Sequence, residues 1–125
     1  MPPFAILKID HIVLRVRDTA LAERFYLEVL GCEVVKRQGQ LAHLHAGSAL
    51  IDLVPAEGSE TGANVDHFCL RVEPFDEDAI RAHLARCGVD VAPAMPRFGA
   101  DGVGPSIYLR DPDGNGVELK GPPQA

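Results

Sequence analysis

This chain contains the stretch Ile9-Asp10-His11-Ile12-Val13-Leu14-Arg15-Val16 and, 56 residues later, the related stretch Val65-Asp66-His67-Phe68-Cys69-Leu70-Arg71-Val72. Both copies keep Asp-His and Leu-Arg-Val at the same places, which makes five identical residues in a window of eight. A match of this kind is improbable by chance. Such self-similarity predicts that the chain is built from two copies of one structural unit.

A helix signal follows each copy of the repeated stretch. Asp18 and Asp76 are predicted N-caps, because an aspartate side chain can accept a hydrogen bond from the first helical turn. Gly31 and Gly88 are placed where a helix end favours glycine. Between them, one helix face is formed by the apolar residues Leu21, Ala22, Phe25, Tyr26 and Val29 in the first copy. In the second copy one face is shared by Ala79, Ile80, His83, Leu84 and Cys87.

Three strands are expected after each helix. In the first copy they cover residues 33–36, 40–45 and 48–54, and in the second copy residues 89–92, 106–110 and 116–120. Residues 93–105 are rich in proline and glycine and are expected to form a mobile loop. The chain is thus predicted to be an α+β protein of eight strands and two helices in one domain, residues 1–125, with module one at about 7–55 and module two at about 64–121.

Composition and charge narrow the class of partner. A chain of 125 residues with 46% hydrophobic and 24% charged residues is ordinary for a soluble domain. The net charge of -6 and the scattered basic residues argue against a nucleic-acid partner. No apolar run reaches the roughly 18 residues that a membrane-spanning helix needs, so no membrane partner is expected. The start of the chain lacks an export signal, so a cytoplasmic protein with a small-molecule or protein partner is expected.

The three cysteines do not form a recognisable framework. They are Cys32, Cys69 and Cys87, without a Cys-x-x-Cys pair, so neither disulfides nor a cysteine zinc site is implied. Cys69 alternates with apolar residues in a predicted strand, and Cys87 falls at the end of a predicted helix. Both are predicted to be small buried residues rather than reactive thiols.

The repeat also pairs the residues that can bind a metal. His11 and His67 occupy the same position in the two copies, and Asp52 is the counterpart of Glu118 near the end of each copy. Two imidazoles with one or two carboxylates suit Zn²⁺, Ni²⁺, Mn²⁺, Co²⁺ or Fe²⁺ and leave a coordination position open for substrate. His11, His67 and Glu118 are therefore the predicted ligands of a divalent metal ion, with Asp52 as their symmetric partner.

Strand alternation supports this assignment. His11 shares a strand face with Val13 and Arg15, opposite the apolar residues that are expected to face the helix. Polar side chains on apolar strands need a partner, which a metal would supply. Other interpretations stay open for single residues: Asp10 and Asp66 as caps of strand ends, and Glu118 as an edge carboxylate. The remaining histidines lack a symmetric counterpart and are interpreted as surface or structural residues; they are His43, His45 and His83.

The sequence resembles the vicinal oxygen chelate superfamily, which includes glyoxalase I, fosfomycin and bleomycin resistance proteins, methylmalonyl-CoA epimerase and extradiol dioxygenases. The resemblance is carried by residues 10–16, 25–31, 66–68 and 108–119. It implies two βαβββ modules that form a cupped mixed sheet around a divalent metal. It also implies a homodimer with sites shared between subunits, in which His11 of one subunit lies beside His67 and Glu118 of the other.

The resemblance further implies a metal-dependent lyase or isomerase of the glyoxalase type that acts on a small oxygen-chelating substrate. Asp52 or Glu118 would move a proton between neighbouring substrate carbons. Because aspartate is one methylene shorter than the glutamate of glyoxalase I, Asp52 is expected to reach the metal through water or to act only as a base. Arg97 and Tyr108, with Lys120, are candidates to hold an anionic substrate. A solvated loop cation is the alternative for Arg97, and a packed strand aromatic is the alternative for Tyr108.

Three other functions fit the same family. An Fe(II) extradiol-type dioxygenase would use His11, His67 and Glu118 as a facial triad, although this chain is short for that role. A drug-binding resistance protein would act without chemistry, although such proteins typically lack the triad. Fosfomycin modification is the third, and no residue pattern singles it out.

Overall fold

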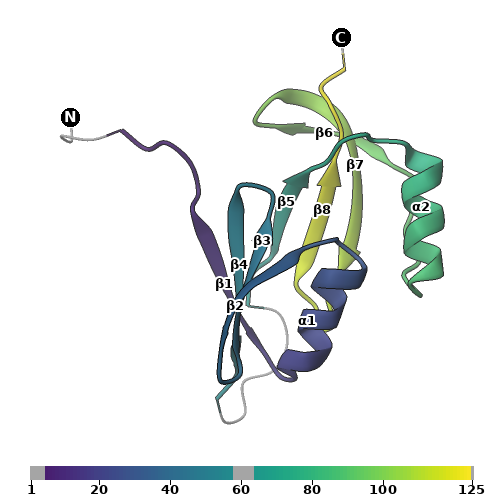
Figure 1. Ribbon diagram of the computed structural model, residues 1–125. Coiled ribbons are helices and arrows are strands. Elements are labelled where there is room, and N and C mark those ends of the chain that lie inside the picture. Colours follow the sequence, from purple (N-terminus) through teal and green to yellow (C-terminus); the bar gives the residue numbers. More distant parts are fainter. Residues whose placement is uncertain (1–4, 58–63, 125) are drawn as a thin grey trace. The chain divides into compact units, whose positions relative to one another are not determined.

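The computed structural model describes residues 5–57 and 64–124. The chain divides into two compact units, residues 1–59 and 60–125, and each unit has the order strand, helix, strand, strand, strand (Figure 1). The elements of the first unit are β1 (His11–Val16), α1 (Thr19–Glu28), β2 (Glu33–Gln38), β3 (Leu41–Ala46) and β4 (Ala49–Pro55). Those of the second are β5 (His67–Arg71), α2 (Glu77–Arg86), β6 (Met95–Gly99), β7 (Gly102–Arg110) and β8 (Gly116–Lys120). The predicted α+β class and the two βαβββ modules are confirmed.

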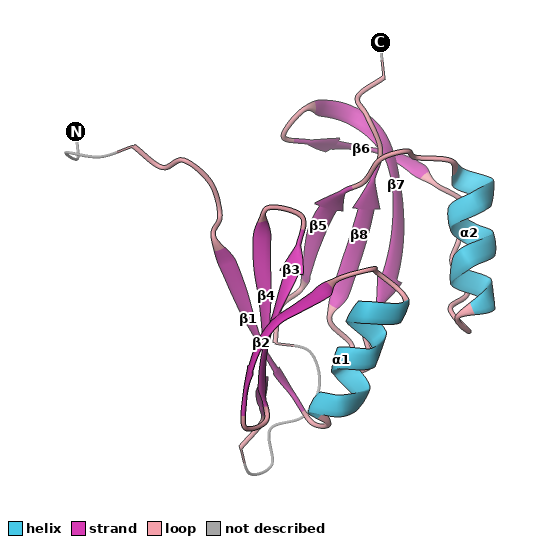
Figure 2. Cartoon of the chain, in the orientation of Figure 1, coloured by secondary structure: helices cyan, strands magenta, loops and turns pink. Residues whose placement is uncertain are grey.

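Each unit contains one mixed four-stranded sheet (Figure 2). The strand orders are β1-β4-β3-β2 and β5-β8-β7-β6, in which the first pair of each sheet is parallel and the others are antiparallel. Strand register repeats as well. Asp52 lies between Val13 and His43 in the first sheet, and Glu118 lies between Cys69 and Tyr108 in the second. The internal repeat therefore extends from sequence to hydrogen-bonding register.

Both predicted helix caps are present. The Asp18 carboxylate accepts a hydrogen bond from the Leu21 backbone N–H at 3.0 Å, and the Asp76 carboxylate accepts one from the Ala79 N–H at 3.1 Å. These bonds satisfy donors that the first helical turn leaves without a partner. The buried face of α1 is narrower than the sequence pattern indicated, because Ala22 and Tyr26 are buried while Leu21 is exposed.

The face of β1 that carries the candidate ligand is the predicted one. Leu14 and Val16 are fully buried, whereas His11, Val13 and Arg15 are exposed. Burying each large apolar side chain contributes about 1.5–3 kcal/mol to folding, so this alternation holds the strand in one orientation. His11 is therefore kept on the open face of the first sheet.

The segment between α2 and β7 differs from the prediction. Residues 89–92, expected as a strand, are not a strand, and the expected loop 93–105 contains β6 and the beginning of β7. In this hairpin Pro96 lies opposite Pro105. Because β6 is an edge strand, a proline without an N–H costs little there. The prolines and glycines that indicated a loop thus belong to an edge hairpin.

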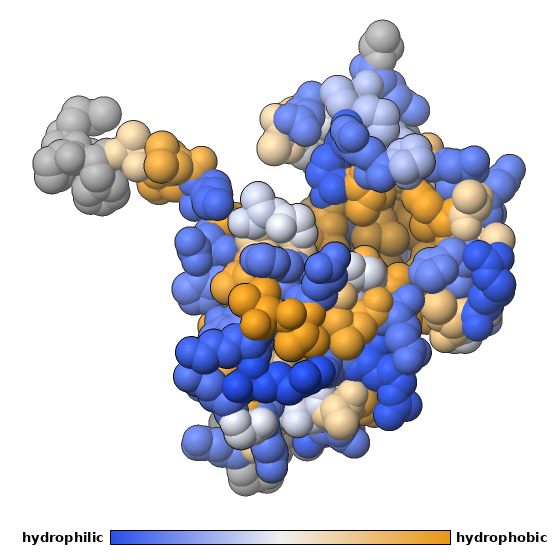
Figure 3. Space-filling view, in the orientation of Figure 1, coloured by the Kyte–Doolittle hydropathy of each residue, from blue (hydrophilic) through white to orange (hydrophobic). Residues whose placement is uncertain are grey.

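Cys32 is buried, whereas Cys69 and Cys87 are exposed, so the prediction that Cys69 and Cys87 are buried is wrong. The reason for Cys69 is strand parity, since it shares the open face of β5 with His67. Apolar surface is also exposed in the segment before β1 (Figure 3), where Ile6, Leu7 and Ile9 are more than two-thirds accessible. Neither helix in the described part of the chain is long and apolar enough to cross a membrane.

Candidate metal centre

Each candidate histidine is held by the aspartate that precedes it. The Nδ1 atom of His67 lies 2.6 Å from Oδ2 of Asp66, and Nδ1 of His11 lies 2.8 Å from Oδ1 of Asp10. A carboxylate only accepts hydrogen bonds, so Nδ1 carries the proton, and in a neutral imidazole the lone pair then lies on Nε2. Metal-binding histidines characteristically have such a carboxylate behind them. The repeated Asp-His pair therefore has a physical reason beyond capping a strand end.

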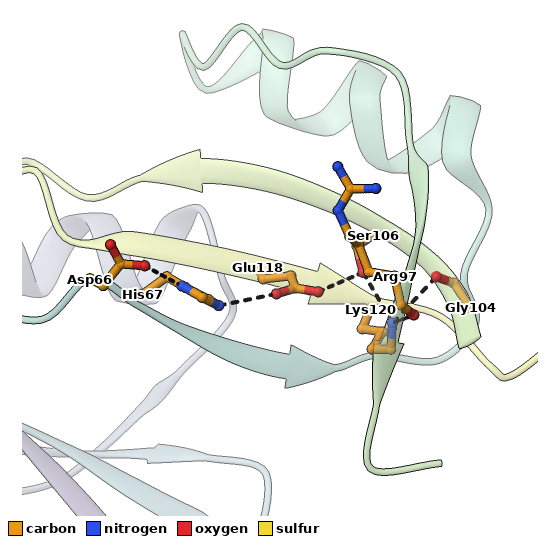
Figure 4. A network of polar contacts seen from close by, with 7 residues as sticks. All are labelled: Asp66, His67, Arg97, Gly104, Ser106, Glu118 and Lys120. Atoms are coloured by element: carbon orange, nitrogen blue, oxygen red, sulfur yellow. Dashed lines mark hydrogen bonds and ion pairs between the residues drawn. The ribbon is translucent and has the colours of Figure 1, made fainter. Parts of the chain in front are cut away.

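His67 and Glu118 face one another in the second unit (Figure 4). The Nε2 atom of His67 lies 3.4 Å from Oε1 of Glu118. Two ligands bound at about 2.0–2.2 Å with tetrahedral angles are separated by about 3.4 Å, so the separation of these two atoms fits a shared divalent metal. With the imidazole proton on Nδ1, both of these atoms present lone pairs, so they do not form a hydrogen bond with each other.

The second oxygen of Glu118 is held from behind. The Ser106 hydroxyl donates to Oε2 of Glu118 at 2.6 Å, and the Lys120 ammonium lies 3.3 Å from the Ser106 oxygen (Figure 4). Lysine can only donate, so the proton of Ser106 is directed to the carboxylate. All three groups are buried. This chain of hydrogen bonds fixes one oxygen of Glu118 and leaves the other, Oε1, directed at His67.

Lys120 uses all its donors within the protein. Besides Ser106, its ammonium donates to the backbone carbonyls of Arg97 and Gly104. An ammonium has three N–H groups, so none remains for a ligand. The structure therefore gives Lys120 a supporting position beneath Glu118, with its N–H groups directed at protein oxygens.

The first unit carries a different pair. Oδ1 of the buried Asp52 lies 2.7 Å from Nδ1 of His43, which is directly opposite on β3. The hydrogen bond from Asp10 raises the pKa of His11, partial burial opposes that rise, and the charge of Asp52 adds to it. His11 and Asp52 are thus close enough to interact electrostatically, and His43 joins them on the same face.

His43 is a further candidate residue, which reasoning from the internal repeat had interpreted as surface or structural. It has no histidine counterpart in the second unit, where Tyr108 takes the equivalent register position. A usable signal was present in the sequence. A tight hairpin turn at Gly47 and Ser48 places His43 opposite Asp52, because paired positions are equidistant from the turn.

Tyr108 lies beside His67 and Glu118. Its ring packs edge-on against the imidazole of His67, with centroids 6.2 Å apart. Burial raises the pKa of Tyr108, Glu118 adds to the rise, and Arg97 opposes it, so the phenol stays protonated at neutral pH. The Arg97 guanidinium donates to the carbonyl of Pro96 at 2.8 Å. Arg97 therefore interacts with the phenol and also with the backbone of its own strand.

His67 lines two cavities of the second unit. One, of about 300 Å³, lies along His67, Cys69 and Glu118, and the other, of about 350 Å³, lies beside Asp66, His67 and Tyr108. Burial raises the pKa of the Cys69 thiol to about 11, so Cys69 lines the first cavity as a neutral group. The candidate ligands therefore border spaces that a small molecule can enter.

Across residues 5–57 and 64–124, no three histidine, cysteine, aspartate or glutamate side chains cluster closely enough to hold a metal. The second unit brings together His67 and Glu118, whereas His11 belongs to the first unit. The full predicted ligand set of His11, His67 and Glu118 stays a prediction.

Comparisons with known proteins identify the fold family. Residues 8–119 match the Glyoxalase/Bleomycin resistance protein/Dioxygenase superfamily. Virulence protein STM3117 of Salmonella typhimurium is 32% identical over 120 residues, which cover 90% of this chain and 82% of that protein. Its crystal structure superposes with a TM-score of 0.81 at 30% identity, covering 95% of this chain and 99% of that one.

Two further relatives carry named activities. Catechol-2,3-dioxygenase of Bacillus subtilis is 29% identical over 121 residues, which cover 89% of this chain but 40% of that protein. Lactoylglutathione lyase from Agrobacterium tumefaciens superposes with a TM-score of 0.69 at 27% identity, covering 97% of this chain and 96% of that one. The matched length therefore agrees better with the lyase than with the dioxygenase.

Proposed function

The chain belongs to the glyoxalase/bleomycin resistance protein/dioxygenase superfamily, and we propose that it is a divalent-metal-dependent lyase or isomerase of the glyoxalase type. Its substrate is a small molecule with two adjacent oxygens. The observation that carries the proposal is the spacing of 3.4 Å between Nε2 of His67 and Oε1 of Glu118, which suits two ligands of one metal. The end-to-end match with a lactoylglutathione lyase supports the reaction class.

In this proposal His11, His67 and Glu118 hold the metal. Asp10 and Asp66 keep the two imidazoles oriented, and their contacts of 2.8 and 2.6 Å support that assignment. The metal, which can be Zn²⁺, Ni²⁺, Mn²⁺, Co²⁺ or Fe²⁺, supplies a Lewis acid for negative charge that develops on the substrate oxygens.

Proton transfer is assigned to the protein's own side chains. Asp52 has His43 against one oxygen and lies within electrostatic reach of His11, which supports its carboxylate as the group that takes or returns a proton. Glu118 is the second candidate base. Tyr108, protonated at neutral pH, and Arg97 would hold the substrate's oxygens or acidic groups.

We further propose that the working form is a cytoplasmic homodimer with sites shared between subunits. The exposed apolar side chains of Ile6, Leu7 and Ile9 support an association through the segment before β1, because such a cluster is costly to leave in water. Light scattering on the purified protein measures the oligomeric state, and a monomer at micromolar concentration contradicts this part of the proposal.

Elemental analysis of the purified protein, followed by Co²⁺ titration of the metal-free form, tests the metal site. We expect stoichiometric metal in the wild type and none in His67→Ala or Glu118→Gln. Turnover is then measured with thiol adducts of 2-oxoaldehydes, using the metal found. A wild-type protein that takes up no divalent metal contradicts the proposal directly.

An Fe(II) extradiol-type dioxygenase is the second candidate, favoured by the 29% identity to a catechol-2,3-dioxygenase. It predicts oxygen consumption with catechols, found only with ferrous iron. A drug-binding resistance protein is the third. It predicts tight binding of a drug without turnover and without a metal requirement, which the same Co²⁺ titration separates from the two enzymes.

A further inference from the structure

The open face of β5 carries an arginine in addition to a candidate ligand. His67, Cys69 and Arg71 alternate along the strand on its exposed side, and all three line the cavity of about 300 Å³ together with Glu118. Four residues of extended strand separate the Cα atoms of His67 and Arg71 by about 13 Å. The cavity therefore runs from the candidate metal ligands to a guanidinium.

Much of the hydrogen-bonding capacity of Arg71 is unused. Its Nη1 lies 3.3 Å from the carbonyl of Val72 and 3.7 Å from the exposed carboxylate of Glu73. An ion pair of that length with an exposed group contributes little. Within the described residues, Nε and Nη2 of Arg71 make no hydrogen bond. These nitrogens form the planar fork that binds a carboxylate through two parallel hydrogen bonds.

The other charged or polar groups along the cavity do not serve this purpose. Lys120 donates all three of its N–H groups to protein oxygens, and the Cys69 thiol is only a weak hydrogen-bond donor. Asp101 also lines the cavity, but it is exposed, so water and salt screen its charge. Arg71 is consequently the cation of this cavity that is able to bind a ligand directly.

We propose that Arg71 binds a carboxylate at the end of the substrate remote from its two adjacent oxygens. The inference rests on the proposed function, because that function puts the two adjacent oxygens at the metal. It narrows the substrate class to an acidic molecule whose uncharged middle passes Cys69. The repeat places Arg15 at the equivalent position of β1. Of these two arginines, only Arg71 lines the cavity of about 300 Å³.

The test compares two alkyl hydroxamates of equal length on the Co²⁺-loaded protein. Both offer two adjacent oxygens; one chain ends in a carboxylate and the other in its methyl ester. By calorimetry we expect the acid to bind on the order of tenfold more tightly than the ester. Arg71→Met, which keeps the apolar stem, should abolish this preference and leave Co²⁺ binding unchanged, while Arg71→Lys should keep part of it.

Arg86→Met, in the last turn of α2, is the matched control and should bind like the wild type. Equal affinity for acid and ester, or a preference that survives in Arg71→Met, overturns the proposal. Should the protein bind no Co²⁺, the proposed function fails separately. The acid and ester are then compared on the metal-free protein by the NMR signal of the Arg71 Nε–H, which only the acid should shift; equal shifts overturn the role of Arg71.

Discussion

Nδ1 of His43 lies 2.7 Å from Oδ1 of Asp52 across the β3–β4 pair, so the buried carboxylate has a protein partner before any ligand binds. Its counterpart Glu118 instead directs one oxygen at His67 and receives the Ser106 hydroxyl on the other. Two equivalent carboxylates thus have different surroundings. That difference supports different roles for them, with Glu118 as a ligand and Asp52 in proton transfer.

Asp52→Asn should separate these roles. We expect the variant to retain its metal, because His11, His67 and Glu118 are untouched, and to lose about 10²- to 10⁴-fold in kcat, the usual contribution of a positioned acid or base. Metal content by elemental analysis and kcat on the substrate found are the two measurements. Loss of metal in Asp52→Asn would instead identify Asp52 as a ligand.

Removing the carboxylate that orients a metal-binding histidine should lower the affinity for the metal without abolishing binding. Asp66→Ala leaves the Nδ1–H of His67 without its acceptor at 2.6 Å, and we expect Co²⁺ affinity to fall about 10- to 100-fold. Asp90→Ala, at an exposed position away from the cavity, is the control and should bind Co²⁺ normally. Unchanged affinity in Asp66→Ala would mean that Asp66 does not support a ligand.

The buried hydrogen bonds of Ser106 with Glu118 and Lys120 should contribute to the free energy of unfolding. Ser106→Ala leaves one oxygen of Glu118 and one N–H of Lys120 without a partner, so the free energy of unfolding should fall by about 1–3 kcal/mol. Urea unfolding of the metal-free protein measures it. Ser48→Ala, at an exposed turn position, should lie within about 0.5 kcal/mol of the wild type. A similarly small effect of Ser106→Ala would contradict this role.

Cys69 should be unreactive at neutral pH although the residue is exposed in part. Burial and the neighbouring Glu118 raise its pKa to about 11, so the reactive thiolate is scarce until the pH approaches that value. Alkylation by iodoacetamide, followed by mass spectrometry, should therefore accelerate steeply only in alkaline solution. Glu118→Gln removes one cause of the raised pKa and should speed alkylation at neutral pH. Rapid labelling of the wild type at pH 7 would refute this expectation.

Several features of the fold could be predicted because they depend on local periodicity. Alternation along residues 11–16 correctly assigned Leu14 to the core and His11 to the open face. Asp18 and Asp76 were identifiable as caps because a cap acts within one helical turn. The edge hairpin of β6 was not identified, since its prolines and glycines indicate a loop unless the partner strand is known.

The sequence by itself determined the two-module architecture and the face of β1 that carries His11. It also determined that His11 is equivalent to His67, and Asp52 to Glu118, in the internal repeat. Only the tertiary structure decided the contacts of those side chains. Ser106 and Lys120 meet Glu118, and His43 meets Asp52, through hydrogen bonds between neighbouring strands. Such contacts depend on register and on side-chain direction across the sheet, whereas alternation along one strand reports only which face a residue occupies.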